Sequence, residues 1–189
     1  MRMSGKPARS RIVHAARIAL LAVLLLASSR APGSAQTFQE PDVFLAETFS
    51  QNVPAPELLT VTAEMQRDIA RILRHSYRAR QLRYWRDADR TVWILEEIGR
   101  YRPITVGLVV SQGSLETIRV LIYRESHGWE VRHDFFTNQF KGLTLDEQNN
   151  LSGRIDGISG ATLSVNALRN LARFALYLDR AVRASGLAQ

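Results

Sequence analysis

Four segments rich in β-branched and aromatic residues follow one another between residues 82 and 124. The breaks between them are short, at Asp87–Arg90, Gly99–Pro103 and Gln112–Ser114. Connections of this length join antiparallel neighbours, whereas parallel strands need crossovers of a dozen or more residues. We therefore predict one antiparallel sheet from the segments Leu82–Trp85, Val92–Ile98, Ile104–Val110 and Thr117–Arg124.

Alternation along the last segment shows which faces of this sheet are covered. Successive strand residues point to opposite faces. One face would carry Ile118, Val120 and Ile122, and the other Arg119, Leu121 and Tyr123. Because the second set is mixed, part of the sheet is expected to be covered on both sides. The same rule separates Glu96 from Glu97, which excludes a paired-carboxylate acid/base site, and we assign Trp85 and Trp93 to the core.

Two helices are expected to flank the sheet. The first spans Ala63–Tyr77 with Thr62 as its N-cap, and the second spans Leu163–Ala184. The second has a buried stripe of Leu168, Leu171, Ala175, Leu178 and Val182, with Arg169, Arg173, Arg180 and Arg183 largely outside it. The first helix carries a row of four arginines, Arg67, Arg71, Arg74 and Arg78. This row is either a binding patch for phosphate or for an acidic partner, or simply a face exposed to solvent. The predicted fold class is α+β, a single domain whose twisted antiparallel sheet lies between an N-terminal and a C-terminal helix.

The first 35 residues have the three-part layout of a secretory signal peptide. A basic leader precedes the unbroken apolar run Ile18–Ala27, and a small, polar stretch ends at Ala35, a plausible cleavage residue. The apolar run is about half the roughly 20 residues that a spanning helix needs. We predict export to the periplasm, with an irregular lead-in over 36–60, the domain over 61–184 and a tail over 185–189.

Removing this leader changes the charge balance. The chain has 25 Lys and Arg against 18 Asp and Glu, a net charge of +7, but six of the basic residues and none of the acidic ones precede residue 36. The remainder is nearly neutral, so nucleic-acid binding loses its main support. The sequence contains no Cys, which excludes a disulfide, a thiolate metal site and cysteine-attached haem. His127 and His133 define no metal geometry, and no structural metal is expected.

Residues 154–165 read RIDGISGATLSV, a small, glycine-containing loop that leads into the last helix. Gly157 and Gly160 permit backbone conformations and close approaches that a Cβ would block. Thr162 or Ser164 would lie near the free N–H groups at the positive end of the helix dipole, where a phosphate binds well. The alternative is an ordinary capped helix start. The spacing fits neither the Walker phosphate loop nor the dinucleotide-binding glycine pattern.

The stretch Asp156-Gly-Ile-Ser-Gly-Ala-Thr162 resembles the signature of the FMN-binding domain family, which includes the C subunit of sodium-pumping quinone reductase and the G subunit of Rnf-type complexes. The resemblance extends over about residues 104–182 and includes Glu125-x-x-Gly128 and Phe140-x-Gly142. It departs from the family at Ser126-His127, where Thr-Pro is frequent.

This resemblance implies that FMN is attached to Thr162 through a phosphoester bond made by a dedicated flavin transferase that uses FAD. The residues implied to surround the cofactor are Asp156, Gly157, Ser159, Gly160, Ala161, Glu125 and Gly128. No His, Lys or Cys neighbours Thr162 to activate its hydroxyl, which favours attachment by a separate enzyme.

The leading functional hypothesis is an exported electron carrier that serves a membrane-embedded redox partner. A flavin-dependent reductase with its own substrate is the alternative, for which His127, His133 and Tyr123 are the candidate acids. A flavin-free binding or scaffold module is a further alternative. Trp129, Phe135 and Phe136 would stack on a flavin ring or pack in the core.

Overall fold

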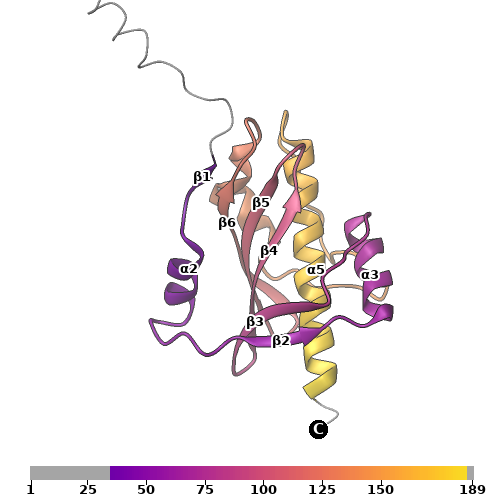
Figure 1. Ribbon diagram of the computed structural model, residues 1–189. Helices are drawn as coiled ribbons and strands as arrows, with labels where there is room; N and C mark the ends of the chain where they lie inside the picture. Colours follow the sequence, from indigo (N-terminus) through magenta and orange to yellow (C-terminus); the bar gives the residue numbers. More distant parts are fainter. Residues whose placement is uncertain (1–34, 187–189) are drawn as a thin grey trace, which may run out of the picture. The chain divides into compact units, whose positions relative to one another are not determined.

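The computed structural model describes residues 35–186, which contain one six-stranded antiparallel sheet (Figure 1). The strands lie side by side in the order β1-β6-β5-β4-β3-β2. Their bounds are β1 Gln36–Thr37, β2 Glu57–Thr60, β3 Gln81–Asp87, β4 Arg90–Ile98, β5 Pro103–Ser111 and β6 Ser114–Tyr123. The four predicted strands are thus confirmed as β3 to β6, each joined to the next by a short turn. The α+β class is confirmed as well.

Residues 36–60 differ from the expected irregular lead-in. They form the two edge strands β1 and β2, with helix α2 (Pro41–Thr48) between them. The prolines suggested a loop, but Pro41 lies in the first turn of α2, where its missing N–H is not needed. Short edge strands also carry too little pattern to be recognised in a sequence.

Helix α3 (Ala63–Leu73) begins where the sequence predicted and ends four residues early. The Thr62 hydroxyl accepts from the Met65 N–H at 3.2 Å, which confirms the N-cap. At the other end Arg74 adopts the left-handed conformation, with φ of 64°, and terminates the helix. Tyr77 lies beyond it and packs edge-on against Phe174 of α5 (Thr162–Gly186), with ring centres 5.1 Å apart.

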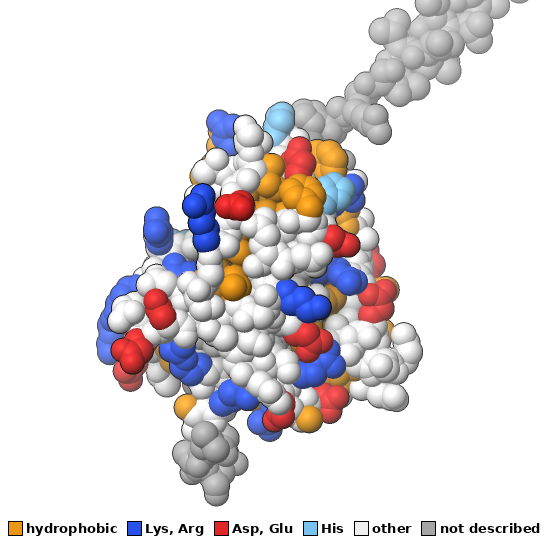
Figure 2. All heavy atoms as spheres, turned by 180° about the vertical axis from the view of Figure 1, so that it is seen from behind, with side chains coloured by type: hydrophobic (Ala, Val, Ile, Leu, Met, Phe, Trp, Pro, Cys, Tyr) orange, Lys and Arg blue, Asp and Glu red, His pale blue; other side chains and the backbone are white. Residues whose placement is uncertain are grey.

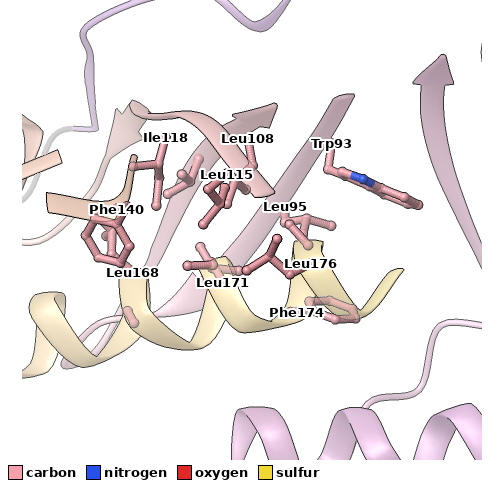
Figure 3. Packing of buried hydrophobic residues seen from close by; sticks show 14 of the residues in the cluster. Trp93, Leu95, Leu108, Leu115, Ile118, Phe140, Leu168, Leu171, Phe174 and Leu176 are labelled. Atoms are coloured by element: carbon pink, nitrogen blue, oxygen red, sulfur yellow. The ribbon is translucent and has the colours of Figure 1, made fainter. Parts of the chain in front are cut away.

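The main core lies between one face of the sheet and α5. Figure 3 shows Trp93, Leu95, Leu108 and Leu115 of the sheet facing α5. The predicted apolar stripe of α5 is buried in this core. Helix α2 lies on the opposite side of the sheet from α5 (Figure 1). Its residues Phe44 and Leu45, together with Phe49 just after the helix, join a second apolar cluster that includes Trp85. Coverage of the sheet on both sides and the core positions of the two tryptophans are therefore confirmed.

A β-bulge in β6 changes the predicted alternation near its end. Thr105 pairs with Ile122 and Val106 with Val120, so Leu121 is an extra residue without a partner. Ile118 and Val120 face the main core as predicted, but Leu121 and Ile122 both join the second cluster and Tyr123 joins the main one. The prediction for Ile122 and Tyr123 is therefore wrong. The bulge directs Tyr123 toward the start of α5.

Short helices occupy part of the loop-rich stretch between β6 and α5. They are η1 (Trp129–Arg132), α4 (Asp134–Thr137) and η2 (Asn138–Phe140). No helix within residues 35–186 has the length and apolar character that crossing a bilayer requires. The predicted signal peptide lies outside the described residues, apart from Ala35.

Candidate functional site

The last helix begins at Thr162, without a side chain that caps it. The Ala161 carbonyl accepts the first intrahelical hydrogen bond, from the Val165 N–H at 2.9 Å, which makes Ala161 the N-cap. Its methyl group cannot accept a hydrogen bond, unlike the Ser, Thr, Asp or Asn usually found there. The described residues supply no acceptor for the N–H groups of residues 162–164. The first turn of α5 thus presents free donors beside the exposed Thr162 side chain.

The two hydroxyls at this helix start have different environments. Ser164 is buried, and its hydroxyl lies 2.8 Å from that of Tyr123. The Tyr123 hydroxyl in turn donates to the His127 carbonyl at 2.5 Å. Burial raises the pKa of Tyr123, which keeps it a protonated donor at neutral pH. Of the two hydroxyls that the sequence offered, only that of Thr162 faces solvent.

Gly128 brings the Glu-x-x-Gly segment against this helix start. It has φ of 88°, and a Cβ built on it would lie 2.8 Å from the Ser164 hydroxyl oxygen and 3.0 Å from that of Tyr123. Neither the backbone conformation nor the space accommodates a side chain. Gly128 was predicted to lie beside the cofactor, and in the structure it packs closely against Ser164, Tyr123 and Ala161.

Glu125 faces a different partner. One of its carboxylate oxygens accepts from three successive backbone N–H groups in the β4–β5 turn, those of Arg100, Tyr101 and Arg102, at 2.5, 2.5 and 2.9 Å. Partial burial raises the pKa of Glu125, but the three donors outweigh it and the net effect lowers the pKa. The carboxylate is therefore anionic at neutral pH and anchors the strand end to the turn.

The signature loop itself is exposed around its glycines. The Asp156 N–H donates to the Gln139 side chain at 2.7 Å, and the Asp156 carboxylate lies 3.3 Å from Arg154. Gly160 has φ of 81°, which explains why glycine is required there. Gly157 has no such requirement, and a Cβ at either position would meet nothing within 4 Å. Ser159 is exposed, so the loop leaves open space next to Thr162.

Arginines of α5 position the long segment that precedes the signature. They were expected to lie outside the core, and they do, but each binds backbone carbonyl groups. Arg169 donates to Ile155, Arg173 to Asn149 at 2.6 Å and Arg180 to Leu145 at 3.2 Å. This role could not be read from the sequence, because nothing in an exposed arginine indicates which carbonyl it binds.

An aromatic cluster is exposed on the η1–α4 segment. The His133 ring lies between those of Trp129 and Phe135, with ring centres 5.4 and 6.1 Å apart. Trp129 is 41% exposed and Phe135 65%, whereas Phe136 is buried in the core. Figure 2 shows hydrophobic side chains next to histidine on the face seen there. Trp129 and Phe135 are thus free to contact a ligand, and Phe136 is not.

Two pockets are lined in part by the segments described above. One of about 680 Å³ is lined by β6 and the η1–η2 segment and includes none of the predicted cofactor residues. The other, of about 400 Å³, includes Arg154 and Ile155, immediately before the signature. No cluster of three or more His, Asp and Glu suited to a metal ion occurs among residues 35–186.

Comparison with known proteins identifies the segment that contains this site. Residues 99–177 match the FMN-binding domain family, which confirms the resemblance seen in the sequence. Solved structures that resemble the chain include NqrC of Shewanella oneidensis, at 16% identity and a TM-score of 0.49, over 70% of this chain and 82% of that one. No curated protein matches the chain.

Proposed function

We propose that this chain, whose residues 99–177 match the FMN-binding domain family, carries FMN covalently on Thr162 through a phosphoester bond. In this proposal it relays electrons between a membrane-embedded redox partner and an acceptor outside the cytoplasm. The observation that carries the proposal is the exposed Thr162 hydroxyl at a helix start that no side chain caps, within the matched segment.

The residues present fit such a group. A phosphodiester on Thr162 would lie at the N-terminal end of α5, where free N–H groups and the helix dipole favour its negative charge by roughly 0.3–1 kcal/mol. The open space beside Gly157 and Gly160 leaves room for the rest of the cofactor. When bound, FMN supplies the redox chemistry, and the protein supplies position and polarity.

The surroundings of Thr162 support attachment by a separate flavin transferase. A threonine hydroxyl is a weak nucleophile unless a base activates it. No hydrogen bond joins the Thr162 hydroxyl to another group among the described residues. The activating base would therefore belong to the transferase. A covalent bond also suits an exported protein, because the helix dipole alone is too weak to retain a cofactor in open solution.

Intact-mass measurement tests the proposal directly. The mature protein, co-expressed with a flavin transferase, should gain the mass of FMN less one water. Thr162→Val should abolish the gain, whereas the matched change Thr144→Val, at another exposed threonine, should leave it intact. An unmodified wild-type mass, obtained with a transferase that flavinylates a second protein in the same cells, contradicts the proposal and favours a flavin-free module. Turnover of a small substrate by the flavinylated protein alone would instead favour a reductase.

A further inference from the structure

The pocket beside the signature differs from the rest of the surface in its charge. Four arginines line it, Arg74, Arg154, Arg169 and Arg173, together with asparagine side chains, and no carboxylate does. We call it the arginine pocket. Figure 2 shows acidic and basic side chains interspersed on the face seen there, as expected for a nearly neutral domain.

Little in the chain neutralises this charge. Among residues 35–186, Arg154 is the one pocket arginine that forms an ion pair, with Asp156, and both side chains are largely exposed. Burial lowers the pKa of Arg173, the nearby charge of Arg74 lowers it further, and Asp146 partly opposes them. Arginine nevertheless stays protonated in proteins, so the repulsion between these two cations persists at every physiological pH.

Structural roles explain two of the arginines but not Arg74. Arg169 and Arg173 hold backbone carbonyls of the loop, as described above. The Arg74 side chain makes no hydrogen bond or ion pair with the described residues. Arg74 also ends α3 in a left-handed conformation, with φ of 64°, where glycine or asparagine is usual. Arg74 is exposed and lines the pocket, so its guanidinium is available to a ligand that enters from solution.

We propose that the arginine pocket binds a small oxyanion with two or more negative charges, such as a polycarboxylate or a phosphate. Guanidinium groups match the geometry of carboxylate and phosphate oxygens and can bind them in pairs. A volume of about 400 Å³ is within the range of small-molecule sites. The concave shape favours a small molecule over the acidic surface of a protein.

The site is adjacent to Thr162 but separate from it. Thr162, Asn166, Arg169 and Arg173 recur at helical spacing on one side of α5, and the last three line the pocket. At about 1.5 Å per residue, Arg169 is roughly 10 Å along the helix from Thr162. The proposal does not depend on flavinylation, and it is tested with and without FMN.

Calorimetric titration of the mature protein with citrate, and separately with inorganic phosphate, tests this inference. Binding of either should be saturable at constant ionic strength. Arg74→Asn removes the charge yet tolerates the backbone conformation, and should weaken binding about tenfold, equivalent to about 1.4 kcal/mol. Its thermal midpoint should not fall, which separates lost binding from lost folding. The control Arg67→Gln removes an exposed charge from α3 outside the pocket and should change affinity less than about twofold.

Three results would overturn the inference. The first is the absence of saturable binding of both probes, and the second is equal affinity in wild type and Arg74→Asn. The third is loss of binding when FMN is attached, because the pocket would then belong to the cofactor's own site. Failure of flavinylation leaves the titration of the unmodified protein unaffected, so the two proposals can fail separately.

Discussion

Replacing Gly128 by alanine probes the contact between the Glu-x-x-Gly segment and the start of α5. Gly128 combines a positive φ of 88° with a tight environment, in which a Cβ would lie 2.8 Å from the Ser164 hydroxyl oxygen and 3.3 Å from the Ala161 Cβ. The Ser164 hydroxyl is held by its hydrogen bond with Tyr123, and Ala161 is packed in the main core. Neither can move away without disturbing the helix start that carries Thr162.

Two separate effects set the size of the expected loss. Left-handed backbone costs a residue with a Cβ about 1–2 kcal/mol. Inserting a methyl group into a packed site typically costs a further 1–3 kcal/mol. Gly128→Ala should therefore lower the free energy of unfolding by about 2–5 kcal/mol. Gly142 has a similar φ of 79° and nothing within 4 Å of its Cβ position, so Gly142→Ala should show the backbone part alone, about 1–2 kcal/mol.

Urea unfolding of both variants, followed by far-UV circular dichroism, measures the difference. The denaturant dependence should be unchanged, so that midpoints can be compared directly. Adding Ser164→Ala to Gly128→Ala should reduce the cost of the glycine substitution, because it removes the closest atom. If Gly128→Ala is no more destabilising than Gly142→Ala, the segment is not packed tightly against α5, and the positioning of Thr162 has another cause.

Three further measurements test other parts of the structure. The hydrogen bond with Glu97 raises the pKa of His75 above 6.5, so the stabilisation from this pair is complete below the unfolded-state pKa of His75 and is lost as pH rises through its folded-state pKa. The free energy of unfolding should therefore fall by less than about 1 kcal/mol between about pH 6 and pH 8. His75→Gln should remove that fall when unfolding in urea is measured at each pH. Asp179 is completely buried and accepts from Thr91 and Arg183, each at 2.7 Å, so Asp179→Ala should lower the free energy of unfolding by about 3 kcal/mol. Gly157→Ala should leave the urea midpoint unchanged, because its φ is not left-handed and a Cβ meets nothing within 4 Å.

Much of the sheet was predictable because its signals are local. Strands β3 to β6 contain β-branched runs separated by short turns, and Thr62 directly precedes α3 and caps it with its hydroxyl. The edges were not predictable from such signals. Strand β1 has two residues and is defined by pairing with Ile122 and Tyr123, which are distant in sequence. Helix α2 is stabilised by burial of Phe44 and Leu45 against a sheet face whose residues follow it in the sequence.

The candidate site was predicted in part, for a similar reason. A short signature specifies Thr162 and the conformation of Gly160, both of which are local properties. The bulge at Leu121 is a property of two strands together, and it decides that Tyr123 faces Ser164. The sequence therefore left open which hydroxyl is exposed, and the pairing of β5 with β6 supplies the answer.

Helix α5 connects the stability of the domain with the geometry of its site. Its apolar side forms the core with the sheet, and its polar side binds the carbonyls of residues 145–155, so one rigid element fixes both ends of the loop that precedes Thr162. The loop can then remain open around its glycines without being free to move away. The proposed function requires this combination of Thr162, because in that proposal a transferase must reach the hydroxyl while the protein holds its position relative to redox partners. Substitutions that weaken the carbonyl contacts of Arg173 or Arg180 should therefore disturb the site, although neither side chain belongs to the apolar core.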